Sequence, residues 1–396
     1  MENLPLHILE EIMNLYNTLP LKPPPNQWTI LASFFVTSTS TGMHKILSLA
    51  TGTKCLPSNR LPKDGEAVHD SHAEVLARRG VVRWFLEEIA RFQESQVSQW
   101  IHACDDGKYA LKDDARLSLY VSTVPCGDAS MRFLSSSQDE EMAALKDSAA
   151  RLPSDLTAAT RGRDNYALFG ALRTKPGRAD APSTASMSCS DKIASWSFLG
   201  VQGALGARFM RPLYIHNVII GEVPVHLRSV VQEDCERGLW QRLEGIPGCG
   251  EYSLHPLKVQ FTDLPFVHAR TTVPKVRNSC NDSLWWIADS SRPAEIIING
   301  FKRGIAPKHR HRELHRPQAC RKSMLHLYNE TLGICGLALE LDLPYSTVKL
   351  SMNEYQAAKQ DLIGPNCRFS GWIHGSSIQF EVPQQSSTDK SISEIS

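Results

Sequence analysis

Residues 187–194 read Met-Ser-Cys-Ser-Asp-Lys-Ile-Ala, and this stretch decides how the rest of the chain is interpreted. The residues that follow predict a helix over about 191–199. Cys189 is one of ten cysteines, which are scattered along the chain without the spacing of a small disulfide framework. We expect most of the ten to be small buried hydrophobic residues. Cys189 therefore has to be judged together with the motifs that precede it.

Two other short motifs lie upstream. His72-Ala73-Glu74 opens a segment over about 72–95 whose apolar residues predict a long helix. Pro125-Cys126 follows the apolar run 117–123, which predicts a buried strand. Zinc deaminases combine H-x-E with P-C-x-x-C, in which one histidine and two cysteines bind the metal and the glutamate transfers protons.

The chemistry explains why these residue types are needed. Three protein ligands leave a fourth position for water, whose pKa the metal lowers towards about 7. A neighbouring carboxylate can then take and deliver protons, and a helix dipole would favour the thiolate of Cys126. The pattern is broken here, because C-x-x-C requires a cysteine where Ala129 stands. The motifs alone leave two readings open: a metal site whose third ligand lies elsewhere, or a surface histidine and a structural cysteine.

The stretch 187–194 resolves this choice because it resembles the third-ligand segment of the RNA adenosine deaminase family. That family comprises the adenosine deaminases acting on RNA and the tRNA-specific adenosine deaminases. The resemblance covers roughly residues 28–376. Four further motifs occur in the family's order: Gly52-Thr53-Lys54-Cys55, Pro125-Cys126-Gly127-Asp128, Arg173-Thr174-Lys175 and Glu354-Tyr355-Gln356-Ala357-Ala358-Lys359.

The resemblance implies roles for individual residues. His72, Cys126 and Cys189 would bind Zn²⁺, and Glu74 would be the proton shuttle in hydrolytic deamination of adenosine to inosine. Thr53-Lys54 resembles the pair near the ribose and phosphate of the target nucleotide. Without the family, a plain turn would be the better interpretation of that pair.

Cations are unusually frequent on apolar segments. Arg78 and Arg79 follow Glu74 on a helix that is apolar on nearly every side, and a buried arginine needs an anionic partner. A pair of arginines that reach the surface at the rim is the alternative. Tyr345, Lys349, Gln356 and Lys359 are spaced to share one face of a helix expected over 345–363. A set this rich in cations is expected to surround a polyanion.

The family supplies a candidate, because its members enclose inositol hexakisphosphate in the deaminase core. Two departures from the family pattern, His69 for asparagine and Ser195 for arginine, would alter some contacts. Asp70, Lys175 and Lys192 resemble the polar relay between that site and the zinc centre. The positions matching the inositol phosphate site are Arg78, Arg79, Ser186, Lys192, Trp196, Lys322, Tyr345, Lys349, Tyr355, Gln356, Lys359 and Trp372.

Several features favour the tRNA-specific branch. Residues 1–27 are too few for a double-stranded-RNA-binding domain, so we expect none. Ser130 stands where editing enzymes typically have arginine, and the run Arg173 to Arg178 (R-T-K-P-G-R) resembles the tRNA-specific branch. The implied substrate is adenosine 37 of alanine tRNA. The alternatives are a free nucleoside or cytidine deaminase and a catalytically silent tRNA-binding protein of the same fold.

A basic stretch over 302–322 is the expected RNA-phosphate surface, with a solvated loop as the alternative. A second basic stretch, 161–178, flanks the expected site. The first stretch contains eight cations, with Glu313 as the acidic residue among them: Lys302, Arg303, Lys308, Arg310, Arg312, Arg316, Arg321 and Lys322.

Composition sets the remaining limits. Lys plus Arg is 43 and Asp plus Glu is 42, which excludes a globally basic nucleic-acid binder but not a local basic patch. If part of the positive charge is internal, the outer surface is more acidic than the formal charge of +1 indicates. No apolar run reaches the roughly 18 residues of a membrane span, and the N-terminus is unlike a secretory signal. We expect an intracellular protein in the cytoplasm or nucleus.

Alternating strands and helices predict an α/β fold like that of cytidine deaminases: a three-layer core with a central sheet flanked by helices, and C-terminal helices added to it. We expect an N-terminal helical extension (1–27), one deaminase domain (28–383) and a disordered tail (384–396). Residues 135–165 are expected to be a loop or helical insertion. Asp70 and Ser71 are N-cap candidates for the long helix. Other helices are expected over 5–18, 225–241 and 318–334, and strands over 28–36, 44–50, 212–220, 257–262, 283–288 and 294–299.

Overall fold

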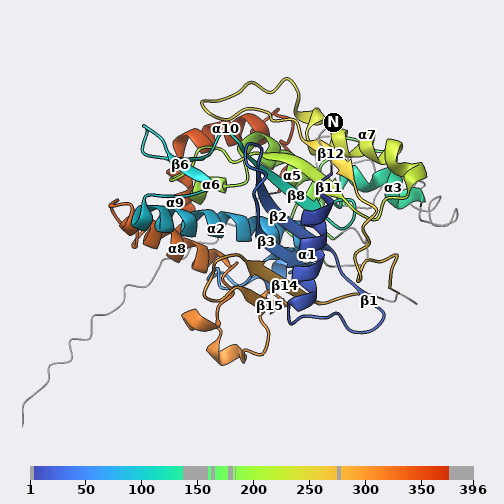
Figure 1. Ribbon diagram of the computed structural model, residues 1–396, viewed down its shortest axis with the longest axis horizontal. Coiled ribbons are helices and arrows are strands. Elements are labelled where there is room, and N and C mark those ends of the chain that lie inside the picture. Colours follow the sequence, from blue (N-terminus) through green and yellow to red (C-terminus); the bar gives the residue numbers. More distant parts are fainter. Residues whose placement is uncertain are drawn as a thin grey trace, which may run out of the picture.

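The structure is a computed structural model that describes residues 4–136, 159–161, 166–176, 182, 184–273 and 278–373. An eight-stranded mixed sheet runs through its centre in the order β12-β11-β8-β2-β3-β14-β15-β16. Helices cover both faces of this sheet (Figure 1), which confirms the predicted α/β architecture. The strands are β2 (Leu31–Ser38), β3 (His44–Thr51), β8 (Ala115–Val121), β11 (Ile215–Ile220), β12 (Lys258–Phe261), β14 (Asp282–Ile287), β15 (Ala294–Ile298) and β16 (Phe301–Lys302).

The two halves of the sheet differ in strand direction. β8, β11 and β12 are parallel to one another, whereas β2 is antiparallel to both β3 and β8. β14 pairs antiparallel with β3, and β14, β15 and β16 continue from it as an antiparallel meander. Parallel neighbours need long crossover connections, which is why the helical segments lie between β8, β11 and β12 in the sequence.

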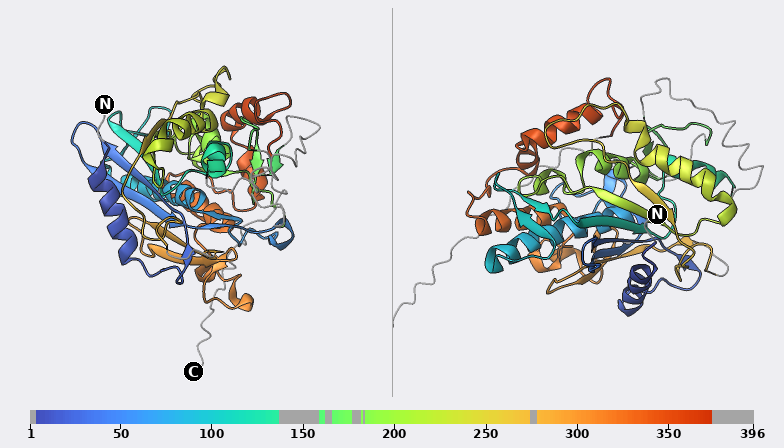
Figure 2. Two further views of the ribbon diagram at one scale, coloured as in Figure 1. Left: turned by 90° about the vertical axis from the view of Figure 1, so that its right-hand side faces the viewer. Right: turned by 45° about the horizontal axis from the view of Figure 1, so that its top comes forward.

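Helix α1 (Leu6–Thr18) covers one face of the sheet, and the other main helices lie on the opposite face (Figure 2). Leu9, Ile12 and Tyr16 are buried in a cluster with the outward-facing side chains of β2, β3, β8 and β14. Leu6, at the start of the helix, is half exposed and does not contribute to the contact.

Helix α2 (Ala73–Ser95) packs on the opposite face and is buried on most of its sides. Trp84 and Phe85 are almost fully buried, and α8 (Arg321–Ile334) lies against α2. The remaining helices of four or more residues in the described part are α3 (Met131–Ser136), α5 (Cys189–Leu199), α6 (Gly203–Gly206), α7 (Arg228–Leu239), α9 (Tyr345–Leu350) and α10 (Asn353–Ile363).

Two expectations about local structure are wrong. The segment 345–363 is two helices, because Met352 leaves the helical conformation with ψ 74° before α10 begins. The argument that four of its residues share one helical face therefore does not hold. Asp70 and Ser71 do not cap α2; they belong to strand β5 (Asp70–His72), and His72 occupies the N-cap position without a side-chain capping bond.

Short two-stranded sheets complete the fold, and one of them carries site residues. β4 (Thr53–Cys55) pairs with β5 just before α2. All ten cysteines are free. None of the described helices is long and apolar enough to cross a membrane. The other pairs are β1 (Gln27–Trp28) with β13 (Asn278–Ser279), β6 (Ile101–Ala103) with β7 (Tyr109–Leu111), and β9 (Thr160–Arg161) with β10 (Arg173–Thr174).

Candidate functional site

The β4–β5 ribbon presents the first group of site residues. It is antiparallel, with Thr53 opposite His72 and Cys55 opposite Asp70. Directly opposed residues of such a pair lie on the same face, and the face alternates along each strand. These four side chains therefore share one face, as the 3.5 Å separation of Cys55 Sγ from His72 Nδ1 shows.

Two loops bring Cys126 and Cys189 to this face. Cys126 follows β8 and precedes a short 3-10 turn (Asp128–Ser130), whereas Cys189 is the first residue of α5. The helix-start position expected for Cys126 thus belongs to Cys189. The backbone N–H of Cys189 lies 3.4 Å from Cys126 Sγ, and the Ser190 hydroxyl donates to the Cys126 carbonyl at 3.0 Å.

A glycine allows this close approach of the two loops. Gly127 has φ +110°, in the region that favours glycine, and a Cβ added there would lie 2.1 Å from Ser188 Oγ. Ser188 is the N-cap of α5 and accepts a hydrogen bond from the backbone N–H of Asp191. The glycine in Pro-Cys-Gly-Asp is therefore needed to seat Cys126 against the start of α5.

The two thiols form a coupled pair beside a buried cation. Hydrogen bonding to Cys189 and the charges of Lys175 and His72 lower the pKa of Cys126 to about 6, although burial and Glu74 oppose this. Burial, and then the interaction with Cys126, raise the pKa of Cys189. Lys175 Nζ lies 3.1 Å from Cys189 Sγ. The pair therefore favours one thiolate near neutral pH, which is the form that binds metal.

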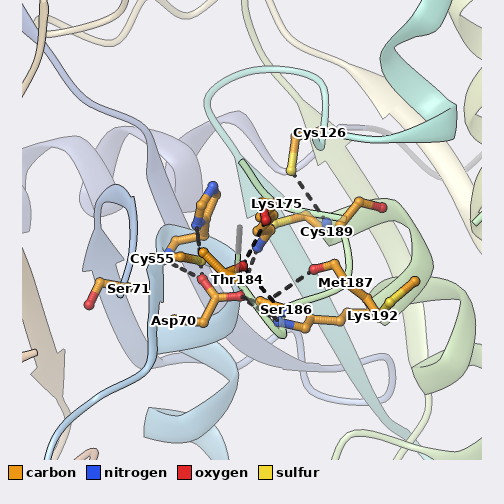
Figure 3. Close-up of polar contacts among 12 residues, drawn as sticks. Cys55, Asp70, Ser71, Cys126, Lys175, Thr184, Ser186, Met187, Cys189 and Lys192 are labelled. Carbon is orange, nitrogen blue, oxygen red and sulfur yellow. Dashed lines mark hydrogen bonds and ion pairs between the residues drawn. The ribbon is translucent and has the colours of Figure 1, made fainter. Parts of the chain in front are cut away.

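Asp70 connects this pair to the rest of the site (Figure 3). Its Oδ2 accepts hydrogen bonds from Lys175 Nζ at 2.9 Å, from Ser186 Oγ at 2.6 Å and from Lys192 Nζ. Its Oδ1 lies 2.9 Å from His72 Nδ1. Burial raises the pKa of Asp70, but Lys175, Lys192 and His72 outweigh this and hold it well below its usual range.

Those contacts also act on the histidine. Burial and Lys175 oppose the protonation of His72, but Cys55 and Asp70 outweigh them and raise its pKa to about 10. A carboxylate on one ring nitrogen fixes the orientation of the ring, as it does in many metal-binding histidines. Asp70, Lys175, Ser186 and Lys192, which the resemblance assigns to the relay and its neighbouring site, thus lie together in the structure.

Glu74 is the acid–base candidate at this face. It lies in the first turn of α2, its side chain is 1% exposed, and Oε2 has no hydrogen-bond partner among the described residues. Its charge raises the pKa of both site thiols, so it lies within electrostatic reach of them. Thr53 Oγ1 is likewise buried without a partner in the part of the chain that the structure describes. Two buried oxygens of this kind mark a place where a polar ligand would be satisfied.

The side chains able to bind a metal include one that the sequence did not single out. Cys55, Asp70 and His72 hold their ligand atoms within 4.8 Å of one another, a group that could hold a metal ion and fits zinc. Because Asp70 is already bonded to two lysines, we interpret it as supporting His72. Cys55 could have been found from the sequence, since strand alternation places it on the same side as Thr53.

A second cluster of charges is formed by residues of α2, α8, α9 and α10. We call Arg78, Arg79, Arg321, Lys349 and Lys359 the internal cation cluster. Burial lowers the pKa of Arg78 to about 10, and burial together with a neighbouring cation lowers the pKa values of Arg321 and Lys359. No carboxylate contributes to any of these three changes in pKa. Within the described residues, these three half-buried cations therefore lack the anionic partner that cations removed from solvent require.

Aromatic and imidazole groups around the cluster respond to its charge. Burial raises the pKa of Tyr345, but Lys349, Arg321 and the arginines of α2 outweigh it and lower that pKa. Burial, with contributions from Lys192, Arg321 and Arg79, lowers the pKa of His69 to about 4. The Arg78 guanidinium lies 5.7 Å from the Trp196 ring and donates to the Val201 carbonyl. The internal cation cluster would therefore bind an anion rather than another cation.

Other residues expected around the polyanion have protein partners. Lys322 Nζ pairs with Glu66 at 3.0 Å, and Gln356 donates to the Lys349 carbonyl at 2.6 Å. Tyr355 packs edge-on against Tyr252, and Trp372 stacks on Phe369. Arg321, which the sequence places in the basic stretch 302–322, is half-buried near Tyr345 and Arg79, so it also belongs to the internal cation cluster. The sequence signal for this location was that Arg321 directly precedes Lys322, which the resemblance assigns to the inositol phosphate site.

Several cations of the basic stretch 302–322 form ion pairs within the protein, so fewer of them are available to RNA than the sequence alone indicates. Lys302 pairs with Glu295 at 2.9 Å, and Arg303 pairs with Asp282 at 3.0 Å. These acidic partners lie on β14 and β15, just ahead of the stretch, so a charge count within 302–322 does not include them. Arg310 instead packs over the Phe301 ring at 4.1 Å. The cations of this stretch are therefore of three kinds. Arg321 belongs to the internal cation cluster, Lys302 and Arg303 form ion pairs, and others face solvent.

The expected substrate residues occupy different environments. Ser130 is buried and donates to the Gly127 carbonyl, and Arg173 is fully buried with Nη2 donating to the Leu168 carbonyl. Both side chains therefore stabilise loops of the site through hydrogen bonds from buried positions. Lys54 lies opposite Ser71 on the other face of the β4–β5 ribbon. Arg178 and most of 135–165 lie outside the described residues, as does the tail from 384.

Comparison of the sequence with known proteins identifies its family and relatives. The adenosine-deaminase (editase) domain family matches residues 48–376. The chain is 33% identical over 317 residues to the tRNA-specific adenosine deaminase 1 of Schizosaccharomyces pombe, covering 77% of this chain and 78% of that protein. The protein of the same name from Drosophila melanogaster is 31% identical, with 76% and 75% covered. That of Saccharomyces cerevisiae is 34% identical, with 71% and 70% covered.

Proposed function

Because the chain belongs to the adenosine-deaminase (editase) domain family, we propose that it deaminates adenosine to inosine in tRNA by hydrolysis. The structural observation that carries this proposal is the buried Glu74 carboxylate, which has an oxygen without a partner among the described residues beside the Cys126–Cys189 pair. The names of its relatives support tRNA as the substrate class.

We propose that His72, Cys126 and Cys189 hold a zinc ion. The donor set fits, because one imidazole and two thiols, of which Cys126 has a lowered pKa, match the ligands of catalytic zinc sites. When bound, zinc supplies Lewis acidity that makes a water molecule nucleophilic near neutral pH. Cys55 lies close enough to His72 to limit the movement of its ring.

The protein residues then perform the proton transfers. Glu74 accepts the proton of the attacking water and delivers protons to the adenine ring and to the departing ammonia. Its burial keeps other water away, so the carboxylate acts only on groups that enter the site. The relay of Asp70, Lys175 and Lys192 holds His72 and the thiolates in place.

The internal cation cluster supports a second proposal, that inositol hexakisphosphate is enclosed within the fold. Half-buried cations that lack carboxylate partners among the described residues fit a ligand that carries many phosphates. Tyr345 and Tyr355 lie among these cations and can donate hydrogen bonds to phosphate oxygens. Lys192 reaches Asp70 from this side, so the ligand and the metal site would share one hydrogen-bond network.

Alanine tRNA and its adenosine 37 are the proposed substrate and position. The test is incubation of the protein with a panel of unmodified tRNAs, with free adenosine and with free cytidine, followed by mapping of inosine and measurement of bound zinc. Inosine at one position of a small set of tRNAs, with free adenosine unchanged, is the expected outcome. Turnover of free adenosine or cytidine would favour the nucleoside deaminase, and zinc binding without inosine would favour the silent tRNA-binding protein.

Removing the buried cation at the thiols should weaken metal binding. Lys175→Met takes away the charge 3.1 Å from Cys189 Sγ and leaves Asp70 with one lysine. We expect the zinc dissociation constant to rise about 10- to 100-fold, as for other residues that support metal ligands. Competition with a chromogenic chelator measures this. Lys45→Met, which removes a surface ion pair with Asp289, is the control and should retain the affinity.

A further inference from the structure

A pocket lies on the opposite face of the β4–β5 ribbon from the metal ligands. It has a volume of about 330 Å³, which is at the lower end of the range for small-molecule sites. Lys54, Cys55 and Ser71 line it from the ribbon, and Lys54 and Ser71 lie on the face that is turned away from Thr53 and His72. Figure 3 shows the Ser71 side chain pointing away from Asp70, Lys175 and Lys192. One thin ribbon therefore separates this pocket from the metal ligands.

The outer wall of the pocket is a hairpin turn held against the segment that leads into β5. Asn299 and Gly300 both have positive φ, the conformation of a tight two-residue turn between β15 and β16. A Cβ on Gly300 would lie 2.7 Å from the Val68 carbonyl, and the Gly300 carbonyl accepts from the Val68 backbone N–H at 2.8 Å. The pocket wall and β5 are thus connected directly, so an occupant would be positioned relative to the active site.

The lining combines positive charge with a stacking surface. Three cations line the pocket (Lys54, Arg60 and Arg310), and none of its lining residues is acidic in the part of the chain that the structure describes. Arg310 lies over the Phe301 ring at 4.1 Å, and its Nε is buried without a hydrogen-bond partner there. Among the described residues, neither Arg60 nor Arg310 forms an ion pair, in contrast to Lys302 and Arg303 nearby.

We propose that this pocket binds a nucleotide of the substrate RNA next to the target adenosine, an inference that rests on the proposed function. The flanking phosphate contacts Lys54 and Arg60, and the base stacks on the Arg310 guanidinium that Phe301 holds in place. RNA bases stack on arginine planes and aromatic rings, and phosphates attract lysine and arginine. Asn281 and Asn299 at the rim can donate to or accept from a base edge.

The test measures binding and catalysis separately. Arg60→Gln combined with Arg310→Gln should weaken the affinity for unmodified alanine tRNA by about 10-fold. The slope of log affinity against log salt should become shallower by about 0.7 for each phosphate that the variant no longer binds.

Phe301→Leu should weaken affinity through loss of stacking. The single-turnover rate at saturating tRNA is measured for the same variants, so that loss of binding is separated from loss of turnover. Arg292→Gln, an exposed arginine at the other end of the β14–β15 hairpin, is the control.

The outcomes are distinguishable. Weaker affinity and a shallower salt dependence in the pocket variants, with Arg292→Gln unchanged, support the pocket. Affinity and salt slope equal to those of the unaltered protein would overturn it, even where inosine is formed. If the unaltered protein binds tRNA but makes no inosine, the proposed function fails while the binding comparison still decides the pocket. Arg60 is exposed, so Arg60→Gln alone repeats the test without risk to folding.

Discussion

Glu74→Gln is expected to lower the rate of inosine formation by about 10²- to 10⁴-fold, the range for loss of a general acid–base group. The substitution keeps the shape of the side chain but removes its ability to take and deliver a proton. Glu74 is buried, and its Oε2 has no partner among the described residues, so the amide would lose no structural bond at that atom. The measurement is the single-turnover rate of inosine formation in tRNA.

A matched substitution on the same helix separates chemistry from folding. Glu88 is also a buried carboxylate of α2, but it pairs with Arg91 and Ser98 away from the site. Glu88→Gln should alter stability and leave the rate within a few-fold, and Glu74→Gln should retain its zinc. A Glu74→Gln protein with full zinc and undiminished rate would mean that another group moves the protons.

The second large effect concerns the internal cation cluster. Acid denaturation of the purified protein is expected to release about one inositol hexakisphosphate per chain. A ligand that binds the folded state alone and is present at 1,000 times its dissociation constant stabilises that state by about 4 kcal/mol. Arg78→Gln should reduce both the recovered phosphate and the melting temperature, because its guanidinium lies among the other cations.

The matched control for this cluster is Arg83→Gln. Arg83 lies on the same helix, but it pairs with Glu87 one turn further on and is not among the charges that act on Arg78. Loss of this pair should cost at most about 1 kcal/mol and leave the phosphate content unchanged. A stable, active protein that releases no organic phosphate would contradict the enclosed ligand.

The sequence predicted the parts of the fold that local patterns encode. Periodic apolar residues located α2 and β8, and the three ligand motifs were found because each follows or precedes a strong element. The juxtaposition of His72, Cys126 and Cys189 could not come from spacing within one chain segment. It came from resemblance, and the structure brings the Cys126 and Cys189 loops together through Ser190.

What the sequence could not supply depends on distant partners. Glu66, from a remote segment, and Glu295, from the adjacent strand β15, neutralise part of the stretch 302–322. Arg321 is turned inward because α8 packs on α2, which no local charge pattern records. Met352 interrupts the last helix without a proline or glycine to mark the break. Ion pairs between elements and the direction in which a helix turns its side chains are therefore the properties that only the structure could supply.

The most direct test of the central claim is the position and amount of inosine in an unmodified alanine tRNA transcript incubated with the zinc-loaded protein. The proposed function predicts inosine at adenosine 37, approaching one per tRNA, and no comparable product with Glu74→Gln. Adenosine that persists at position 37 in the presence of a folded, zinc-containing protein would contradict the proposed reaction at this substrate.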